Sequence, residues 1–115
     1  MLKLLINFNE VKDFPRDYKT MVAYRDKGVW FGEYQDGKLV GITNLDGKKI
    51  KSVYVLPEYR HRGIAYKLIN EASQGIDGCY TLALDTSKSI FEKCGFKVIK
   101  KKEFKLGNVY TMRKE

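Results

Sequence analysis

Residues 53–68, VYVLPEYRHRGIAYKL, decide the fold, because they begin like a β-strand and end like an amphipathic helix. The first amide groups of a helix have no internal partner and carry a partial positive charge. The side-chain-free Gly63, preceded by Arg60 and Arg62, therefore predicts a phosphate-binding loop at the start of this helix. The alternative is that Gly63 only begins the helix and that both arginines are solvated. An apolar stripe at i, i+3, i+4, i+7 supports the helix: Ala65, Leu68, Ile69 and Ala72.

Two common phosphate-binding motifs do not fit this join. No Gly-Lys-Ser/Thr sequence ends it, which excludes a Walker loop. The three-glycine pattern of a dinucleotide fingerprint is also absent.

Composition restricts the class of protein. With 115 residues, 43% of them hydrophobic, the chain is expected to form one domain over residues 1–115. Its 22 Lys and Arg against 14 Asp and Glu give a net charge of +8. This balance favours a polyanionic partner, whether a phosphorylated cofactor, a nucleic acid or an acidic protein surface.

Cysteine and histidine usage argues against a metal site. Cys79 and Cys94 have neither metal-ligand spacing nor the density of a disulfide scaffold, and His61 is the one histidine. We therefore expect no bound metal and a reducing compartment. The apolar run at the N-terminus is short for a signal peptide, and no run approaches about 20 apolar residues, so we expect a cytoplasmic protein without a membrane partner.

Turn signals and periodicity divide the rest of the chain into elements. Asp36-Gly37 and Asp46-Gly47 are strong hairpin signals and predict an antiparallel three-strand meander. Pro15 is suited to the first turn of a helix over residues 14–27 that Gly28 ends. A second short helix, SKSIFEKC, and a last hairpin around Gly107-Asn108 follow the central region. The expected strands are 2–8, 29–34, 38–43, 49–56, 79–86 and the two arms of the last hairpin.

This order, β-α-β-β-β-α-β-α-β-β, predicts an α/β (α+β) fold with one mixed, mostly antiparallel sheet of about seven strands and about three helices. Strand 49–56, the helix that starts at Gly63 and strand 79–86 form one βαβ crossover.

The join also resembles a known family. Residues 60–65, RHRGIA, are similar to the Arg/Gln-x-x-Gly-x-Gly/Ala signature of the GNAT superfamily of acyl-CoA-dependent N-acetyltransferases. Residues 53–59, VYVLPEY, resemble the strand end before that signature, and residues 91–96, FEKCGF, resemble a later helix of the family. The resemblance extends from about residue 29 to the C-terminus, and the family's fold agrees with the order of elements above.

The resemblance implies a cosubstrate and the residues that bind it. Acetyl-CoA would be held at its pyrophosphate by the backbone amides of Arg60, His61, Arg62, Gly63, Ile64 and Ala65. Its pantetheine arm would pair with the main chain of Val53 and Val55, in a gap between strands 49–56 and 79–86. An amine would attack the acetyl carbonyl directly, with a backbone N–H near Val55 stabilising the oxyanion.

The sequence departs from the family in two places. Phe91 stands where the family usually has a tyrosine that acts as general acid beside the sulfur, and Tyr54, Cys94 or water could take this role. The family generally has two helices before the meander, whereas here residues 14–27 alone are available. We therefore expect a shallow, open acceptor site.

The candidates for the general base are Glu33 in the first meander strand and Asp85 after the central strand. The plain alternatives are a solvated strand residue for Glu33 and a turn or cap residue for Asp85. His61 is expected to face solvent, and Cys94 to pack in the core.

Two functions remain open at this stage. The first is an N-acetyltransferase whose amine acceptor is unknown, with a macromolecular or acidic acceptor expected from the open site and the charge. The alternative is an inactive module that binds acyl-CoA or a polyanion. Nucleic acid is not the favoured partner, because the aromatic residues fit a core better than a stacking platform.

Overall fold

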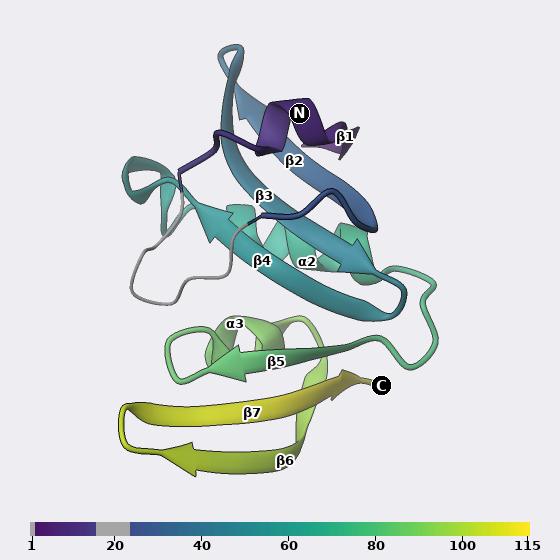
Figure 1. The fold of residues 1–115 in the computed structure, drawn as a ribbon, viewed down its shortest axis with the longest axis vertical. Helices are drawn as coiled ribbons and strands as arrows, with labels where there is room; N and C mark the ends of the chain where they lie inside the picture. Colours follow the sequence, from purple (N-terminus) through teal and green to yellow (C-terminus); the bar gives the residue numbers. More distant parts are fainter. Residues whose placement is uncertain (1, 16–23) are drawn as a thin grey trace.

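The computed structural model describes residues 2–15 and 24–115. Its elements follow the predicted order and confirm the mixed fold (Figure 1). They are β1 (Leu2–Ile6), α1 (Phe8–Val11), β2 (Val29–Gln35), β3 (Lys38–Asp46), β4 (Lys49–Val55), a 3₁₀ turn (Pro57–Tyr59), α2 (Ile64–Ser73), β5 (Tyr80–Leu84), α3 (Lys88–Lys93), β6 (Phe96–Phe104) and β7 (Gly107–Lys114). In the described part of the chain, no helix is both long and apolar enough to cross a membrane.

The seven strands form one sheet in the order β1-β2-β3-β4-β5-β7-β6. Every neighbouring pair is antiparallel except β4 and β5, which are parallel. The helices α2 and α3 cover one face of the sheet, and α1 lies on the other (Figure 1). We call these the helix face and the front face.

The core of the helix face forms where α2 packs on β3 and β4. The predicted stripe is largely confirmed, because Leu68, Ile69 and Ala72 are buried, although Ile64 is buried in place of the half-buried Ala65. Gly41 on β3 permits the close approach, since a Cβ there would lie 2.9 Å from the side chain of Ile64. Full burial contributes about 1.5–3 kcal/mol for each large aliphatic side chain.

The predicted strand over residues 2–8 is too long. Asn7 ends it, because its side chain accepts a hydrogen bond from the amide of Glu10 while the Glu10 carboxylate accepts one from the amide of Asn7. This reciprocal capping box begins α1 directly after β1. The spacing Asn-x-x-Glu was present in the sequence and is the signal that the strand prediction missed.

The predicted helix over residues 14–27 falls largely on residues 16–23, which lie outside the described part of the chain. Residues 24–27, which are described, are not helical. In this segment the Arg25 carbonyl accepts a hydrogen bond from the Trp30 indole. Phe14 is buried, and its ring meets the ring of Tyr54 edge-on with centroids 6.1 Å apart.

The hairpin signals are confirmed with two shifts, the first of which places the turn after β3 at residues 47–48 rather than at Asp46-Gly47. Asp36 and Gly37 both have positive φ, as a tight two-residue turn requires. The last hairpin turns at residues 105–106, so that Gly107 already belongs to β7 rather than to the turn.

The two parallel strands pair only at their beginnings. Lys49 lies opposite Tyr80 and Ile50 opposite Thr81, after which no further pairing joins described residues of β4 and β5. Figure 1 shows the two strands diverging towards their ends. We call this diverging part, residues 51–56 and 82–85, the fork. Thr81 closes its base, since the buried hydroxyl donates a 2.9 Å hydrogen bond to the Ile50 carbonyl.

Replacing Thr81 by valine should therefore loosen the base of the fork. The substitution keeps the shape but removes the donor, and we expect a loss of about 1–2 kcal/mol in the free energy of unfolding, measured by urea denaturation. Thr111→Val is the matched control, because no described residue is hydrogen-bonded to that hydroxyl, and it should change stability by less than about 0.5 kcal/mol. Equal effects of the two variants would show that the bond does not hold the fork.

Candidate functional site at the fork

A β-bulge bends β4 at the fork. The register between β3 and β4 shifts between the pairs Ile42–Tyr54 and Asn44–Lys51. Ser52 lies in the shifted segment with φ of 57°, a left-handed conformation that is rare for a residue other than glycine. A bulge bends its strand and increases the local twist, which accounts for the divergence of β4 from β5.

Beyond the bulge, the backbone of Val55 is directed into the fork. The Leu56 amide donates to the Val40 carbonyl at 2.9 Å, so Leu56 uses the β3 side of the strand. Because consecutive residues alternate, the N–H and C=O of Val55 are on the side of β5. These are the groups that the sequence analysis assigned to an extended ligand.

Arg60 also reaches into the fork. Its Nε donates a 2.9 Å hydrogen bond to the Val55 carbonyl, and its guanidinium lies 5.3 Å from the centroid of the Tyr54 ring. This contact links the end of β4 to the loop that follows. The sequence had indicated a basic loop but not this direction of the side chain.

The loop before α2 offers a set of amides. His61 and Gly63 have φ of 65° and 80°, with Arg62 between them in the ordinary negative-φ region. Alternation of this kind turns successive amides towards one side and forms an anion-binding nest. The amides of residues 61–65 donate to no described residue, and no side chain caps α2. A Cβ at Gly63 would meet nothing within 4 Å, so the space in front of it is open.

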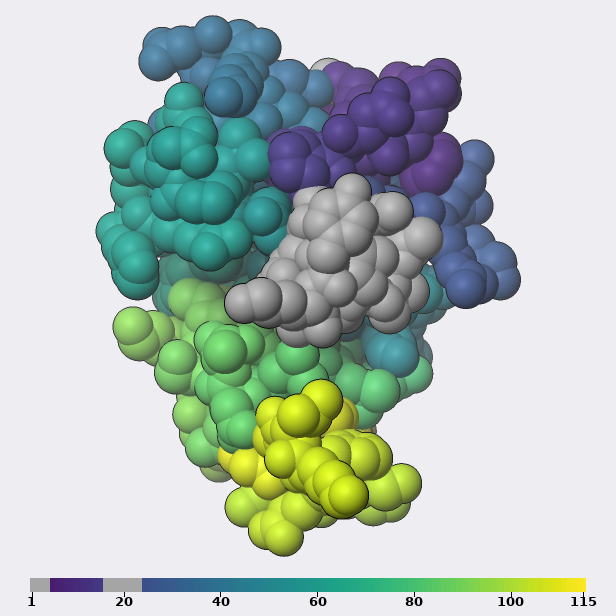
Figure 2. All heavy atoms as spheres, turned by 60° about the vertical axis from the view of Figure 1, so that its left-hand side comes forward, coloured from purple at the N-terminus to yellow at the C-terminus, as the bar shows by residue number. Residues whose placement is uncertain are grey.

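One predicted member of this set is corrected. The amide of Arg60 donates to the Pro57 carbonyl at 3.3 Å within the 3₁₀ turn and is not free for a ligand. The Arg62 guanidinium lies 5.1 Å from the centroid of the Tyr59 ring. His61 is exposed, as expected. In Figure 2 the teal segment that contains this loop lies at the surface, above the green segment of β5 and α3.

Phe91 of α3 is part of the core. Its ring is 3% exposed and meets Phe96 edge-on with centroids 5.3 Å apart. At the position where the resemblance to the family led us to expect a tyrosine, Phe91 therefore packs its apolar ring against the ring of Phe96.

Cys94 is buried as expected and does not suit a role as proton donor. Its Sγ lies 3.8 Å from the Tyr66 carbonyl, and burial raises the pKa of the thiol to about 11. The thiol therefore stays protonated far above neutral pH.

Glu33 is buried but lies away from the fork. It pairs with Gly41, whose missing side chain would point at α2, and its Oε1 is 3.8 Å from the Nζ of Lys67 on that helix. No described residue hydrogen-bonds its other, buried oxygen. Glu33 therefore occupies the helix face, with β3 and β4 between its strand and β5, a position that does not support its predicted role as base.

Asp85 lies in the turn after β5, and its carboxylate is hydrogen-bonded there. Its carboxylate accepts hydrogen bonds from the Tyr110 hydroxyl at 2.7 Å and from the Asn108 amide at 3.0 Å. The Tyr110 bond, followed by those from Asn108, holds the pKa of Asp85 below its usual value. A carboxylate stabilised in this way is a weak proton acceptor, so the structure favours the cap alternative.

Tyr54 is the one of the three catalytic candidates that borders the fork on the front face. It pairs with Ile42, which pairs with Gly32, on the face opposite α2. Its ring lies between Phe14 and the Arg60 guanidinium.

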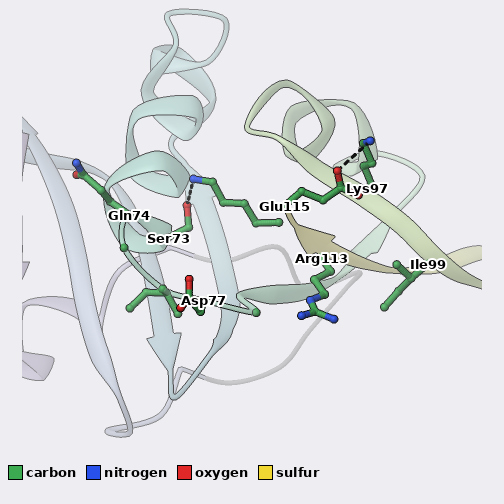
Figure 3. Close-up of a pocket in the computed structure, with 11 residues that line it drawn as sticks. Ser73, Gln74, Asp77, Lys97, Ile99, Arg113 and Glu115 are labelled. Carbon is green, nitrogen blue, oxygen red and sulfur yellow. Dashed lines mark hydrogen bonds and ion pairs between the residues drawn. The ribbon is translucent and has the colours of Figure 1, made fainter.

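A cavity of about 640 Å³ lies elsewhere, between the end of α2, the following loop and the ends of β6 and β7 (Figure 3). Two of the lysines that line it have partners within the cavity. Lys114 donates to the Ser73 hydroxyl at 2.9 Å, and Lys97 lies 3.0 Å from Glu115. It is at the opposite end of α2 from the loop, and we place no function there. No cluster of three or more potential metal ligands occurs among the described residues.

Comparison with known proteins agrees with this geometry. Residues 16–98 match the family model of the acetyltransferase (GNAT) domain. The chain belongs to the GNAT family. A search of curated protein sequences finds no match for this GNAT domain.

Solved structures with the same fold are distant in sequence. A GCN5-related N-acetyltransferase from Rhodopseudomonas palustris has a TM-score of 0.66 and 23% identity over 76% of this chain. This GNAT domain spans only 61% of that protein. A candidate N-acetyltransferase from Lactobacillus plantarum has a TM-score of 0.66 and 18% identity, covering 93% of this chain and 82% of its own. A candidate streptothricin acetyltransferase from Bacillus anthracis, solved with acetyl coenzyme A, has a TM-score of 0.64 and 16% identity, covering 88% and 68%.

The raised pKa of Cys94 gives a direct test of this part of the GNAT domain. At pH 8 a pKa of about 11 leaves about 0.1% of the thiol as thiolate, so native Cys94 should resist iodoacetamide. Because the folded pKa lies above the unfolded value, the stability gained from the neutral thiol is complete at pH 8 and is lost as pH rises towards 11. Mass spectrometry of peptides should show rapid labelling only in denaturant. Rapid labelling of the native protein at pH 8 would contradict the buried position.

Proposed function

We propose that this GNAT domain transfers an acetyl group from acetyl-CoA to a primary amine by direct attack within a ternary complex. The observation that carries the proposal is the combination of the fork with the uncapped loop, because an extended phosphorylated ligand fits both at once. The acetyl-CoA bound to the Bacillus anthracis structure supports the choice of cosubstrate.

Each part of the site has a role in this proposal. The amides of residues 61–65 bind the pyrophosphate, and the positive end of α2 stabilises its charge. The edge of β4 that faces the fork, with the main chain of Val53 and the N–H of Val55, orients the pantetheine arm, while Arg60 holds the Val55 carbonyl. A backbone N–H near Val55 donates to the developing oxyanion. Alignment of two reactants can supply roughly 7–11 kcal/mol of the barrier reduction, so the residues act mainly by positioning.

The proton transfers of this reaction do not require a strongly acidic or basic side chain. The amine nitrogen bonds to the acetyl carbon, the carbon–sulfur bond breaks, and a proton leaves the nitrogen. CoA leaves readily as a thiolate without a strong acid, because an unperturbed thiol such as that of cysteine has a pKa of about 8.5. Tyr54 is the side chain best placed on the front face to relay the amine proton, directly or through water.

The acceptor is proposed to be macromolecular or acidic. The net charge of +8 favours negatively charged partners, and their association weakens as salt rises. An assay of acetyl-CoA turnover with a mixed panel of amines and proteins, read by mass spectrometry, identifies the acceptor class.

A second candidate function rests on Phe91. A GNAT domain whose acid position is an apolar core residue could bind acyl-CoA without turnover. In this alternative the loop still binds acyl-CoA, but no acetyl group is transferred.

Acetyl-CoA should stabilise the folded protein. At about 100 times its dissociation constant, the ligand should add about 2.7 kcal/mol, measured as a rise in melting temperature. Gly63→Asp should abolish the rise, because a carboxylate would enter the open space in front of the loop amides. Gly63→Ala controls for the strain of a Cβ at positive φ, and Lys101→Ala controls for loss of a distant charge. The cosubstrate assignment is wrong if neither acetyl-CoA nor CoA shifts the wild-type melting temperature.

Phe91→Tyr separates the two candidate functions. In an active enzyme the hydroxyl would point towards the sulfur, and turnover should rise by about tenfold or less, or stay unchanged, with little change in stability. In a binding module the buried hydroxyl lacks a partner beside Phe96, and unfolding should become easier by about 1–3 kcal/mol. The two measurements are the melting temperature and acetyl-CoA consumption. A destabilised variant with no turnover in either form would exclude the enzyme.

A further inference from the structure

The front face beyond the fork combines exposed apolar and cationic side chains. Leu82 and Leu84 of β5 are 49% and 38% exposed, and Phe104 of β6 is 54% exposed. No described helix covers this part of the front face (Figure 1). Six residues form what we call the basic-apolar patch: Leu82, Leu84, Phe104, Lys100, Lys102 and Arg113.

The register places these residues on one face. Leu82 pairs with Thr111, which pairs with Lys100, and Leu84 pairs with Val109, which pairs with Lys102. Directly paired residues share a face. Arg113 and Phe104 follow at two-residue spacings along the same strands. Their neighbours Thr81, Ala83 and Met112 are buried on the helix face.

The lysines of the patch carry positive charge without a paired carboxylate, and Glu115, at the Arg113 end, is paired with Lys97. Glu103 is the single carboxylate within β5, β6 and β7, and it pairs with Asn108 on the other face, 3.4 Å from Lys101. Lys102 lies over the Phe104 ring at 5.4 Å, so its charge stands directly beside an apolar surface. No salt bridge to a described residue involves Lys100, Lys102 or Arg113.

A solvated edge strand does not account for the whole patch. Lysine on the edge strand β6 discourages pairing with other chains. However, Leu82, Leu84 and Arg113 lie on β5 and β7, which are interior strands. The exposed leucines on β5 and the lysines on β6 place apolar and charged surface side by side on one face, a combination that suits a protein interface.

We infer that the basic-apolar patch docks an acidic polypeptide that presents its amine to the fork. This inference rests on the proposed acetyltransferase function and names its acceptor class. Charge complementarity selects an anionic partner, and the exposed leucines select a polypeptide over a nucleic acid, because aliphatic side chains bury apolar partner residues but read neither phosphates nor bases. Leu82 and Leu84 also form the β5 arm of the fork, so the patch is continuous with the proposed reaction site.

Binding of a labelled peptide tests the inference independently of turnover. The probe is a synthetic peptide of alternating Glu and Leu with one lysine, followed by fluorescence anisotropy, beside the same peptide with Gln for Glu. The acidic peptide should bind at least tenfold more tightly, and its affinity should fall as salt rises. Equal affinity for the two peptides would overturn the inference.

Neighbouring lysines on opposite faces provide a matched pair of variants. Lys100→Glu with Lys102→Glu should weaken binding at least tenfold, whereas Lys101→Glu, on the other face of the same strand, should change it less than twofold. Leu82→Asn with Leu84→Asn should weaken peptide binding several-fold and leave binding of a single-stranded DNA oligonucleotide unchanged. If Lys101→Glu matches the double variant, or if the DNA binds more tightly than the peptide, the docking inference is wrong.

Two further readouts separate this inference from the proposed function. The acetyl-CoA melting shift and acetylation of a small amine are measured on the wild-type protein and on the Lys100→Glu, Lys102→Glu variant, which leaves the fork unchanged. If the wild type shows both but does not bind the acidic peptide, the docking inference fails and the acetyltransferase stands. If the peptide binds but acetyl-CoA produces neither shift nor turnover, the docking surface stands and the acetyltransferase fails.

Discussion

The loss of pairing between β4 and β5 is the constraint on which the rest of the site depends. A backbone N–H or C=O inside a sheet needs a hydrogen-bonding partner, and two strands that part after two residue pairs leave such groups without their usual one. The structure supports this opening from three sides. The Thr81 hydroxyl holds its base, the bulge at Ser52 bends one arm outwards, and Arg60 occupies the Val55 carbonyl at the far end.

Much of this architecture was predictable because its signals are local. The Asp-Gly turns, the apolar stripe of α2 and the glycine before it each depend on residues within a few positions, and they placed the meander, the crossover and the loop. The capping box of Asn7 and Glu10 is equally local, and a reading that checked for it would have ended β1 correctly.

The remaining features depend on tertiary contacts. Nothing in the residue type of Ser52 marks a bulge, because serine is neither glycine nor otherwise suited to positive φ. The direction of the Arg60 side chain follows from the aromatic ring of Tyr54 and the free edge of β4 beside it. Glu33 and Asp85 were reasonable bases by residue type, but register places Glu33 beneath α2, and residues of β7 hydrogen-bond the Asp85 carboxylate. Residue type alone therefore identifies candidate bases, whereas the orientation of each side chain depends on tertiary contacts.

The bulge also divides β4 into two half-strands of opposite phase. Ile50 pairs with Leu45 and Val55 with Gly41, and both lie on the helix face although they are five positions apart, an odd number. Simple alternation would place Val55 on the front face and turn the phenol of Tyr54 under α2. The bulge absorbs the single extra residue, so the downstream half stays in phase with β3. Deleting that residue would keep the inner and outer side chains of the fork in place, but it would remove the bend that directs β4 away from β5. The extra residue therefore opens the fork and does not decide which side chains face it.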